Sequence, residues 1–216
     1  MSLACTALLV IDMQRDFLDP CGYASQAGLD VDALRRPIPA IQKLLICARR
    51  LGMLVVHTRE GHRPDLADCP PAKLERSRAA GAEIGSPGPL GRLLVRGEFG
   101  HDFIDELHPL PGEPVVDKPG YGAFHQTDLA QILHARGIRN LILGGVTTEV
   151  CVHSTLREAV DRGYCCTLAS DACGSAHAHL HAAALQMVAV EGGVLGRVAD
   201  SAALIAELER TRETAP

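Results

Sequence analysis

Continuous apolar runs alternate along this chain with segments in which apolar residues recur at helical spacing. The apolar runs are typical of strands covered on both faces, and they predict six strands at 4–12, 53–58, 113–118, 140–146, 165–171 and 193–200. The periodic segments predict helices at 31–51, 128–137, 149–162 and 177–191, and a last helix beginning near Ser201. Strands joined by helices favour right-handed crossovers, so we expect a three-layer α/β/α fold with a six-stranded, mainly parallel, doubly wound sheet.

One segment breaks this alternation. Residues 59–112 hold many of the prolines, several glycines and the charged stretch KLERSR, and they are much longer than a usual crossover. Long segments of this kind commonly carry function, so we expect a lid, a pocket wall or a subunit contact here. No linker, repeat or low-complexity tract is visible, and 216 residues fit a single domain over 1–216.

Composition narrows the class of protein. Aromatic residues make up 3% of the chain, so the core is expected to be aliphatic. The 26 acidic against 21 basic residues give a net charge of −5, which argues against a nucleic-acid partner because such proteins need a basic face. No apolar stretch reaches the roughly 18 residues of a transmembrane helix, and the N-terminus lacks the basic region of a signal peptide. We therefore expect no membrane partner and a cytoplasmic location.

The sequence offers no complete pattern for a cofactor or a metal. The eight cysteines form no Cys-x-x-Cys pair, and no Gly-x-Gly-x-x-Gly turn follows any predicted strand. Glu60 and His62 have a spacing that suits a metal ion, but Leu66 stands where a third ligand is needed. We therefore expect neither a cofactor nor a metal, and we expect most cysteines to be buried, reduced thiols.

Three chemically distinct side chains fall at carboxyl ends of predicted strands. Asp12 ends the first strand, Lys118 ends the third, and Cys151 follows the fourth through the turn GGVTTEV. Open parallel sheets bind ligands at this edge, which brings the three together. There Asp12 can accept the thiol proton, while Lys118 and a helix N-terminus stabilise the thiolate. Taken singly, each residue is also explained as a turn residue, a solvated lysine or a buried small side chain.

Three blocks of the sequence resemble a known family. LLVIDMQRDFL (8–18), DKPGYGAF (117–124) and GGVTTEVCVHSTLREAVDRGY (144–164) are similar to the signature blocks of the isochorismatase-like cysteine hydrolases. The resemblance implies a catalytic set of Asp12, Lys118 and Cys151, and a cis peptide bond between Val146 and Thr147. It also implies an oxyanion hole made of the backbone N–H groups of Thr147 and Cys151. Family members suggest a homo-oligomer, commonly a tetramer, with 59–112 as a candidate contact.

The resemblance also bears on the reaction. A cysteine at position 151 favours amide hydrolysis over the vinyl-ether hydrolysis of true isochorismatases, which lack it. Residues 22–28, 57–73 and 109–124 look most like biuret and triuret hydrolases, so we expect a small amide or ureide as substrate and ammonia as a product. Ureidoacrylate and N-carbamoylsarcosine amidohydrolases are the alternative within the family, and the metal site of nicotinamidases is matched only partly. A redox-sensing or binding protein on the same fold is the alternative from another class.

Further side chains are candidates for substrate binding. Three aromatic residues near the signature blocks are expected to wall a pocket, three polar ones follow the second strand, and two lie on or beside the helix before the last strand. Each is also explained as a core or solvated residue. In that order they are Phe17, Tyr121, Phe124, Arg59, Glu60, His62, Gln186 and Glu191.

Overall fold

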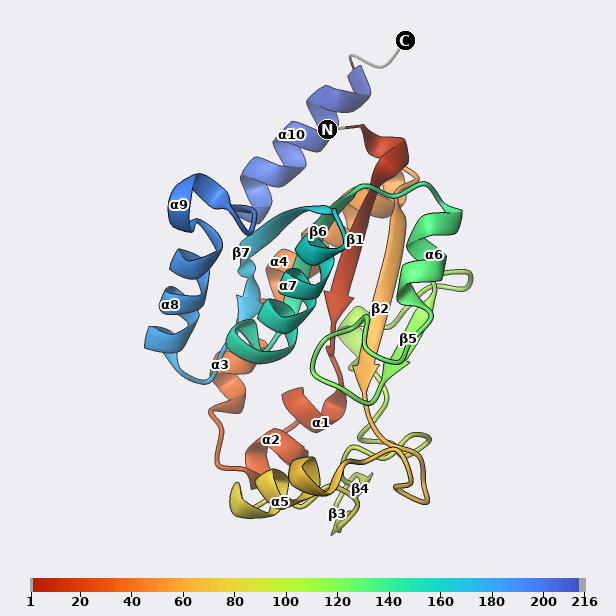
Figure 1. The fold of residues 1–216 in the computed structure, drawn as a ribbon, viewed down its shortest axis with the longest axis vertical. Coiled ribbons are helices and arrows are strands. Elements are labelled where there is room, and N and C mark those ends of the chain that lie inside the picture. The colour runs from red at the N-terminus through yellow and green to blue at the C-terminus, as the bar shows by residue number, and fades with distance from the viewer. Residues whose placement is uncertain (1, 214–216) are drawn as a thin grey trace.

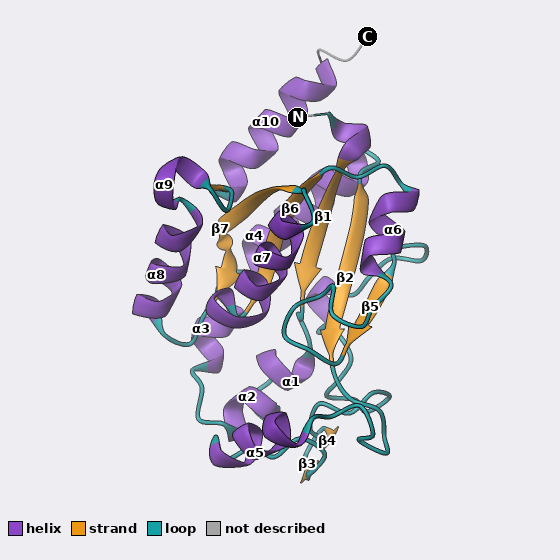
Figure 2. Ribbon diagram, viewed as in Figure 1, coloured by secondary structure: helices purple, strands orange, loops and turns teal. Residues whose placement is uncertain are grey.

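The computed structural model describes residues 2–213 and has a parallel sheet at its centre (Figures 1 and 2). Its six strands lie in the order β5-β2-β1-β6-β7-β8, and every neighbouring pair is parallel. The strands are β1 (Thr6–Ile11), β2 (Leu54–Glu60), β5 (Val115–Lys118), β6 (Asn140–Val146), β7 (Cys165–Gly174) and β8 (Arg197–Ala199). The predicted six-stranded α/β architecture is therefore confirmed, and β6 has the predicted bounds.

Helices cover both faces of the sheet because its central strands are apolar on both sides. Leu8 and Val10 of β1 pack into one core cluster with α4 (Ile38–Arg50) and α10 (Ser201–Glu213). The intervening Leu9 and Ile11 pack into a second cluster with helices on the other face. These helices are α6 (Leu129–Ala135), α7 (His153–Asp161) and α8 (Ala178–Val188). Figure 2 shows α7 in front of the strands and α4 behind them, which gives the three layers.

Two predicted helices are interrupted. The helix expected over 31–51 is two helices, α3 (Val31–Arg35) and α4, with Pro37 between them. Proline has no N–H to donate, so the helical hydrogen-bond ladder is interrupted at this point. The helix expected over 177–191 is α8 followed by α9 (Val190–Gly193), where Glu191 and Gly192 take the left-handed conformation with φ of 51° and 76°.

The first turn of another predicted helix is also irregular. The segment expected as one helix over 149–162 begins as a π-helical turn at Thr148–Val152 and continues as α7. The strand ends shift as well, because β8 is shorter than predicted and β7 runs on to Gly174. A short 3-10 turn at Leu3–Cys5 precedes β1, so this strand begins later than expected.

The long segment 59–112 folds against the carboxyl ends of the strands. It contains α5 (Pro71–Ala79), a small hairpin of β3 (Pro87–Gly88) and β4 (Gly91–Arg92), and a 3-10 turn at Asp105–Leu107. Figure 1 shows α5 together with α1 (Arg15–Leu18) and α2 (Tyr23–Gln26) beyond the arrowheads of β1 and β2, at the end of the molecule opposite the chain termini. This segment therefore covers the edge at which the candidate residues were predicted.

Two further expectations concern the burial of the cysteines and the presence of membrane-spanning helices. All eight cysteines are free thiols; four are buried, whereas Cys21 and Cys165 are exposed, so the expectation that most are buried holds for only half of them. Among the described residues, no helix is long and apolar enough to cross a membrane.

Candidate active site

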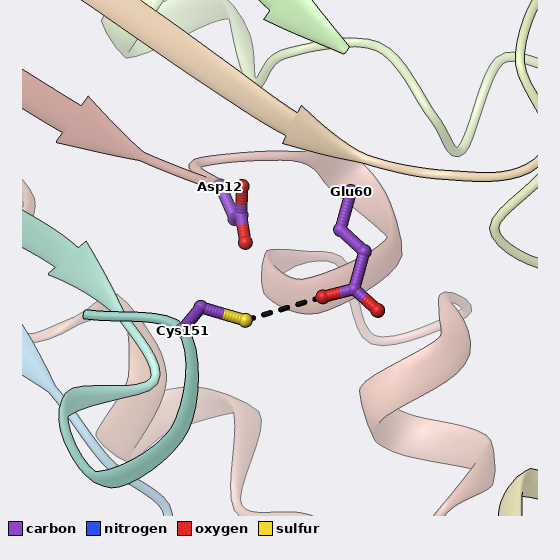
Figure 3. Close-up of side chains that lie close together, drawn as sticks. All are labelled: Asp12, Glu60 and Cys151. Atoms are coloured by element: carbon purple, nitrogen blue, oxygen red, sulfur yellow. Dashed lines mark hydrogen bonds between the residues drawn. The ribbon is translucent and has the colours of Figure 1, made fainter. Parts of the chain in front are cut away.

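The carboxyl edge of the sheet brings four functional side chains together. Asp12 follows β1, Glu60 ends β2, Lys118 ends β5, and Cys151 lies in the π-helical turn after β6. Figure 3 shows Asp12, Glu60 and Cys151 pointing toward one another from these three elements. One ligand-type atom from each of these three lies within 4.8 Å of the others.

Lys118 is the charged centre of this cluster. Its side chain has no exposed surface, and its Nζ lies 2.8 Å from Asp12 Oδ2 and 3.2 Å from Glu60 Oε2. The ammonium also donates to the backbone carbonyls of Gly120 and Tyr121, at 2.9 Å each. A buried ammonium is stable only when it is paired and hydrogen-bonded, and both conditions are met here. These partners raise the pKa of Lys118 despite its burial, so it stays a cation.

Hydrogen bonds and an ion pair hold both the backbone and the side chain of Glu60 in place. Its N–H donates to Gln14 Oε1 at 2.7 Å, and Gln14 Nε2 donates back to its carbonyl at 3.0 Å. Its Oε1 pairs with Lys73 Nζ at 2.6 Å, and its Oε2 accepts a hydrogen bond from the Cys151 thiol at 3.2 Å. Burial by itself favours the neutral acid, but Lys118 and Lys73 outweigh it and lower the pKa of Glu60 to about 2.

Asp12 has a different environment from Glu60. It has no exposed surface, its Oδ1 accepts the Thr58 hydroxyl at 2.5 Å, and its only cationic partner among residues 2–213 is Lys118. Burial raises the pKa of Asp12 above its ordinary value, because the Lys118 charge compensates only in part and the Glu60 charge adds to the rise. Two carboxylates whose environments separate their pKa values are a common arrangement for acid–base work.

The turn that carries Cys151 depends on glycine. A side chain at Gly145 would place its Cβ 2.0 Å from the Ile11 carbonyl oxygen, and this residue has φ of 131°. The Val146–Thr147 peptide bond is cis, at the position implied by the family resemblance. Cys151 is 5% exposed, and burial together with the Glu60 and Asp12 charges raises its pKa well above the usual value despite Lys118. Burial and these two carboxylates therefore favour the thiol over the thiolate.

A cavity of about 280 Å³ opens onto Cys151. Aromatic and aliphatic side chains form most of its wall, while Glu60, Lys73 and Thr147 give it polar groups, a composition typical of small-molecule sites. It is lined by Phe17, Tyr23, Leu29, Glu60, Lys73, Arg76, Ser77, Ile84, Leu94, Tyr121, Thr147, Val150 and Cys151.

Three of the eight substrate-binding candidates line this cavity, namely Phe17, Glu60 and Tyr121. Arg59 does not, because adjacent residues of a strand point to opposite faces; its guanidinium instead pairs with Asp117 at 2.8 Å.

The remaining four candidates also lie elsewhere. His62 is buried against Asp68, with 3.2 Å between Nδ1 and Oδ1. Phe124 is part of the apolar core, and Gln186 and Glu191 are exposed. Arg59, His62, Phe124, Gln186 and Glu191 therefore do not line this cavity, which differs from the expectation that they wall or line the substrate pocket.

Sequence reasoning missed Lys73 and Tyr23. Lys73 lies in the charged stretch of α5, where the sequence looks like a solvated helix, yet it is 5% exposed and contacts Glu60. Tyr23 lies on α2 and lines the cavity beside Phe17, with 6.0 Å between the ring centroids. Neither residue has a local sequence signal, because both reach the site through the folding of irregular segments.

Asp12, Glu60 and Cys151 are the kinds of side chain that bind metals, and their spacing is compact. However, the Lys118 ammonium lies within 3.2 Å of both carboxylates, and Lys73 holds Glu60 from the other side. These two cations already neutralise the two carboxylates, and they would repel a divalent ion. The cluster is therefore better suited to thiol chemistry than to metal binding.

Comparison with known proteins agrees with this geometry. A model of the isochorismatase domain family matches residues 6–201. A cysteine hydrolase from Pseudomonas syringae pv. phaseolicola is 28% identical with a TM-score of 0.83, over 98% of this chain and 95% of that one. An isochorismatase family protein from Desulfovibrio vulgaris is 28% identical with a TM-score of 0.79, over 95% of this chain and 99% of that one. An N-carbamoylsarcosine amidase from Thermoplasma acidophilum shares the fold. It is 24% identical with a TM-score of 0.69, over 93% of this chain and 97% of that one. The family match covers most of the chain, which therefore belongs to the isochorismatase family of hydrolases.

Proposed function

We propose that this protein is a cysteine amidohydrolase that cleaves a C–N bond of a small amide or ureide and releases ammonia. The observation that carries the proposal is the placement of a buried cysteine at the floor of a cavity, within a cluster of Asp12 and Glu60 that Lys118 holds together. A thiol, a proton acceptor and a fixed cation in one water-poor site are the parts that nucleophilic acyl transfer needs.

In the proposed reaction, the Cys151 sulfur attacks the substrate carbonyl and Asp12 accepts the thiol proton. Asp12 suits this role because burial raises its pKa, which makes its carboxylate the more basic of the two. The negative charge on the carbonyl oxygen is stabilised by the backbone N–H groups of Thr147 and Cys151, two residues that line the cavity. Asp12 then protonates the leaving nitrogen, and water, activated by Asp12, hydrolyses the acyl-enzyme. Lys118 holds Asp12 in place throughout.

The cavity supports a small and largely planar substrate. Its volume of about 280 Å³ lies at the small end of ligand pockets, and Phe17, Tyr23 and Tyr121 offer flat faces for a conjugated urea or amide group. Biuret and triuret have this size and planarity. With biuret, ammonia leaves first and hydrolysis of the acyl-enzyme releases allophanate.

One observation favours a second substrate class, the ureido acids that carry a carboxylate. Arg76 lines the same cavity from α5 and is exposed, and among residues 2–213 no carboxylate forms an ion pair with its guanidinium. A free guanidinium at a cavity wall suits a carboxylate at the far end of the substrate. Ureidoacrylate and N-carbamoylsarcosine are probes of this class.

The test is ammonia release from a panel of biuret, triuret, ureidoacrylate, N-carbamoylsarcosine, nicotinamide and maleamate. Release from at least one of the ureides, lost in Cys151→Ser, is the expected result. Selective turnover of the carboxylate-bearing probes, lost in Arg76→Ala, would identify the second class. Silence across the whole panel would refute the amidohydrolase proposal as stated.

A further inference from the structure

Glu60 is a second carboxylate at the nucleophile, and the reaction proposed above leaves it unused. It is 3% exposed, and each of its oxygens has a defined partner. Oε1 faces Lys73 Nζ at 2.6 Å, while Oε2 is 3.2 Å from both Lys118 Nζ and Cys151 Sγ. Figure 3 shows the thiol directed to Glu60 rather than to Asp12. In the absence of substrate, the thiol hydrogen therefore points away from the residue that must later accept it.

Lys73 fixes Glu60 from outside the sheet. It lies on α5, within the segment that covers the carboxyl edge, and it is 5% exposed. Besides Glu60, its ammonium donates to the Pro119 carbonyl at 2.7 Å and lies 5.0 Å from the centre of the Tyr121 ring. These contacts connect the segment that covers the site with the floor of the cavity.

We propose that Glu60 keeps Cys151 a protonated, oriented thiol in the empty enzyme, and that Lys73 holds Glu60 in place while partly offsetting its negative charge at the sulfur. The thiolate then forms only when a substrate carbonyl reaches the sulfur and Asp12 takes the hydrogen. This inference rests on the proposed function for the role of Asp12, but it concerns the resting thiol, which can be measured without any substrate.

The charges around the sulfur support this role. Asp12, Glu60 and Lys118 face it from β1, β2 and β5, Lys73 from α5 lies behind Glu60, and Tyr23 of α2 lines the same cavity. A carboxylate that accepts the S–H hydrogen bond stabilises the thiol and repels the thiolate.

Two lysines contact Glu60, whereas one contacts Asp12. Glu60 is therefore a weaker base than Asp12. It remains ionised and does not take the proton of the Cys151 thiol.

The proton and electrons balance without any further reactant. As the S–C bond forms from the sulfur electron pair, the thiol proton moves to an Asp12 oxygen, and the carbonyl π pair moves onto the substrate oxygen. Collapse of the tetrahedral intermediate breaks the C–N bond, and the proton held by Asp12 leaves with the nitrogen as part of ammonia. Glu60 and Lys73 keep their charges throughout, so they act as positioning residues.

The experiment measures the rate at which iodoacetamide alkylates Cys151 as a function of pH, with peptide masses separating this thiol from the exposed Cys21 and Cys165. In Glu60→Gln, we expect the midpoint pH of alkylation to fall by at least about one unit, which raises the alkylation rate below the midpoint about tenfold. In Lys73→Met, we expect the midpoint to rise, because a cation near the site is lost. Turnover falls in both variants.

Glu113→Gln is the matched control. Glu113, like Glu60, is an ion-paired carboxylate, although it is only half-buried; it pairs with Arg49 at 2.8 Å near the amino end of β5, away from Cys151. Its alkylation profile should equal that of the wild type.

Opposite shifts in the two variants cannot arise from general loosening of the fold, which would increase alkylation in both. An unchanged or raised midpoint in Glu60→Gln overturns the inference. If that variant does not fold, an unchanged or lowered midpoint in Lys73→Met overturns it. A silent amide panel with the expected alkylation shifts would refute the proposed function alone.

Discussion

Replacing Asp12 with asparagine removes the proposed proton acceptor and its ion pair with Lys118, while it keeps the shape of the side chain. The side chain keeps its size, and the remaining oxygen can still accept the Thr58 hydroxyl, which lies 2.5 Å from Asp12 Oδ1. The negative charge 2.8 Å from Lys118 Nζ is lost. Asparagine also tolerates the left-handed backbone found at position 12, where φ is 52°.

The expected magnitudes follow from these contacts. Loss of general acid–base catalysis lowers kcat by about 10²–10⁴-fold. Breaking a buried ion pair typically costs about 3–5 kcal/mol of unfolding free energy. Lys118 retains Glu60 at 3.2 Å and two carbonyls at 2.9 Å, so we expect a loss near the low end of that range, about 3 kcal/mol.

The assay compares ammonia release by Asp12→Asn and the wild type on the best substrate of the panel, with urea unfolding as the measure of stability. Gln186→Ala is the control, because its exposed side chain lies outside the cavity; it should retain wild-type turnover. Turnover of Asp12→Asn within tenfold of the wild type, in a folded protein, would refute the reasoning about the base.

Three further predictions follow from the structure. Gly145→Ala should lower the unfolding free energy by about 3 kcal/mol or more, because its Cβ would meet the Ile11 carbonyl, whereas Gly52→Ala, with open space around it, should cost about 1 kcal/mol; urea midpoints compare them. Burial lowers the pKa of His57 to about 4, so its contribution to stability is complete above about pH 6.5 and is lost as the pH falls toward 4. His57→Gln should therefore show a shallower fall of Tm over this range than the wild type. An equal fall would contradict the conclusion that protonation of His57 destabilises the fold. A chelator should leave turnover unchanged, because Lys118 and Lys73 neutralise the carboxylates; a loss restored by added metal would show that a cation is needed.

The sheet and three members of the site could be predicted because they follow from general properties of parallel sheets. Apolar runs mark buried strands, and the carboxyl ends of parallel strands share an edge, so Asp12, Lys118 and Cys151 come together although up to 139 positions separate them. The interruption at Pro37 was also visible in the sequence, but the apolar spacing on either side of it continued without a break and favoured one helix.

The pocket was harder to predict, because side-chain direction and irregular segments determine it. Arg59 and Glu60 are neighbours, and strand alternation allows only one of them to face the cavity; which one depends on the face that the covering segment leaves open. Lys73 comes from that covering segment, whose path has no periodic signal. Long-range packing of this kind cannot be inferred from local sequence patterns.

The central claim is that the Cys151 sulfur becomes acylated during turnover. The most direct measurement quenches the working enzyme in acid and determines the mass of the peptide that contains residue 151. We predict an adduct equal to the substrate minus ammonia on the wild-type peptide, and neither adduct nor ammonia release in Cys151→Ala. Ammonia release by Cys151→Ala at the wild-type rate would contradict the account.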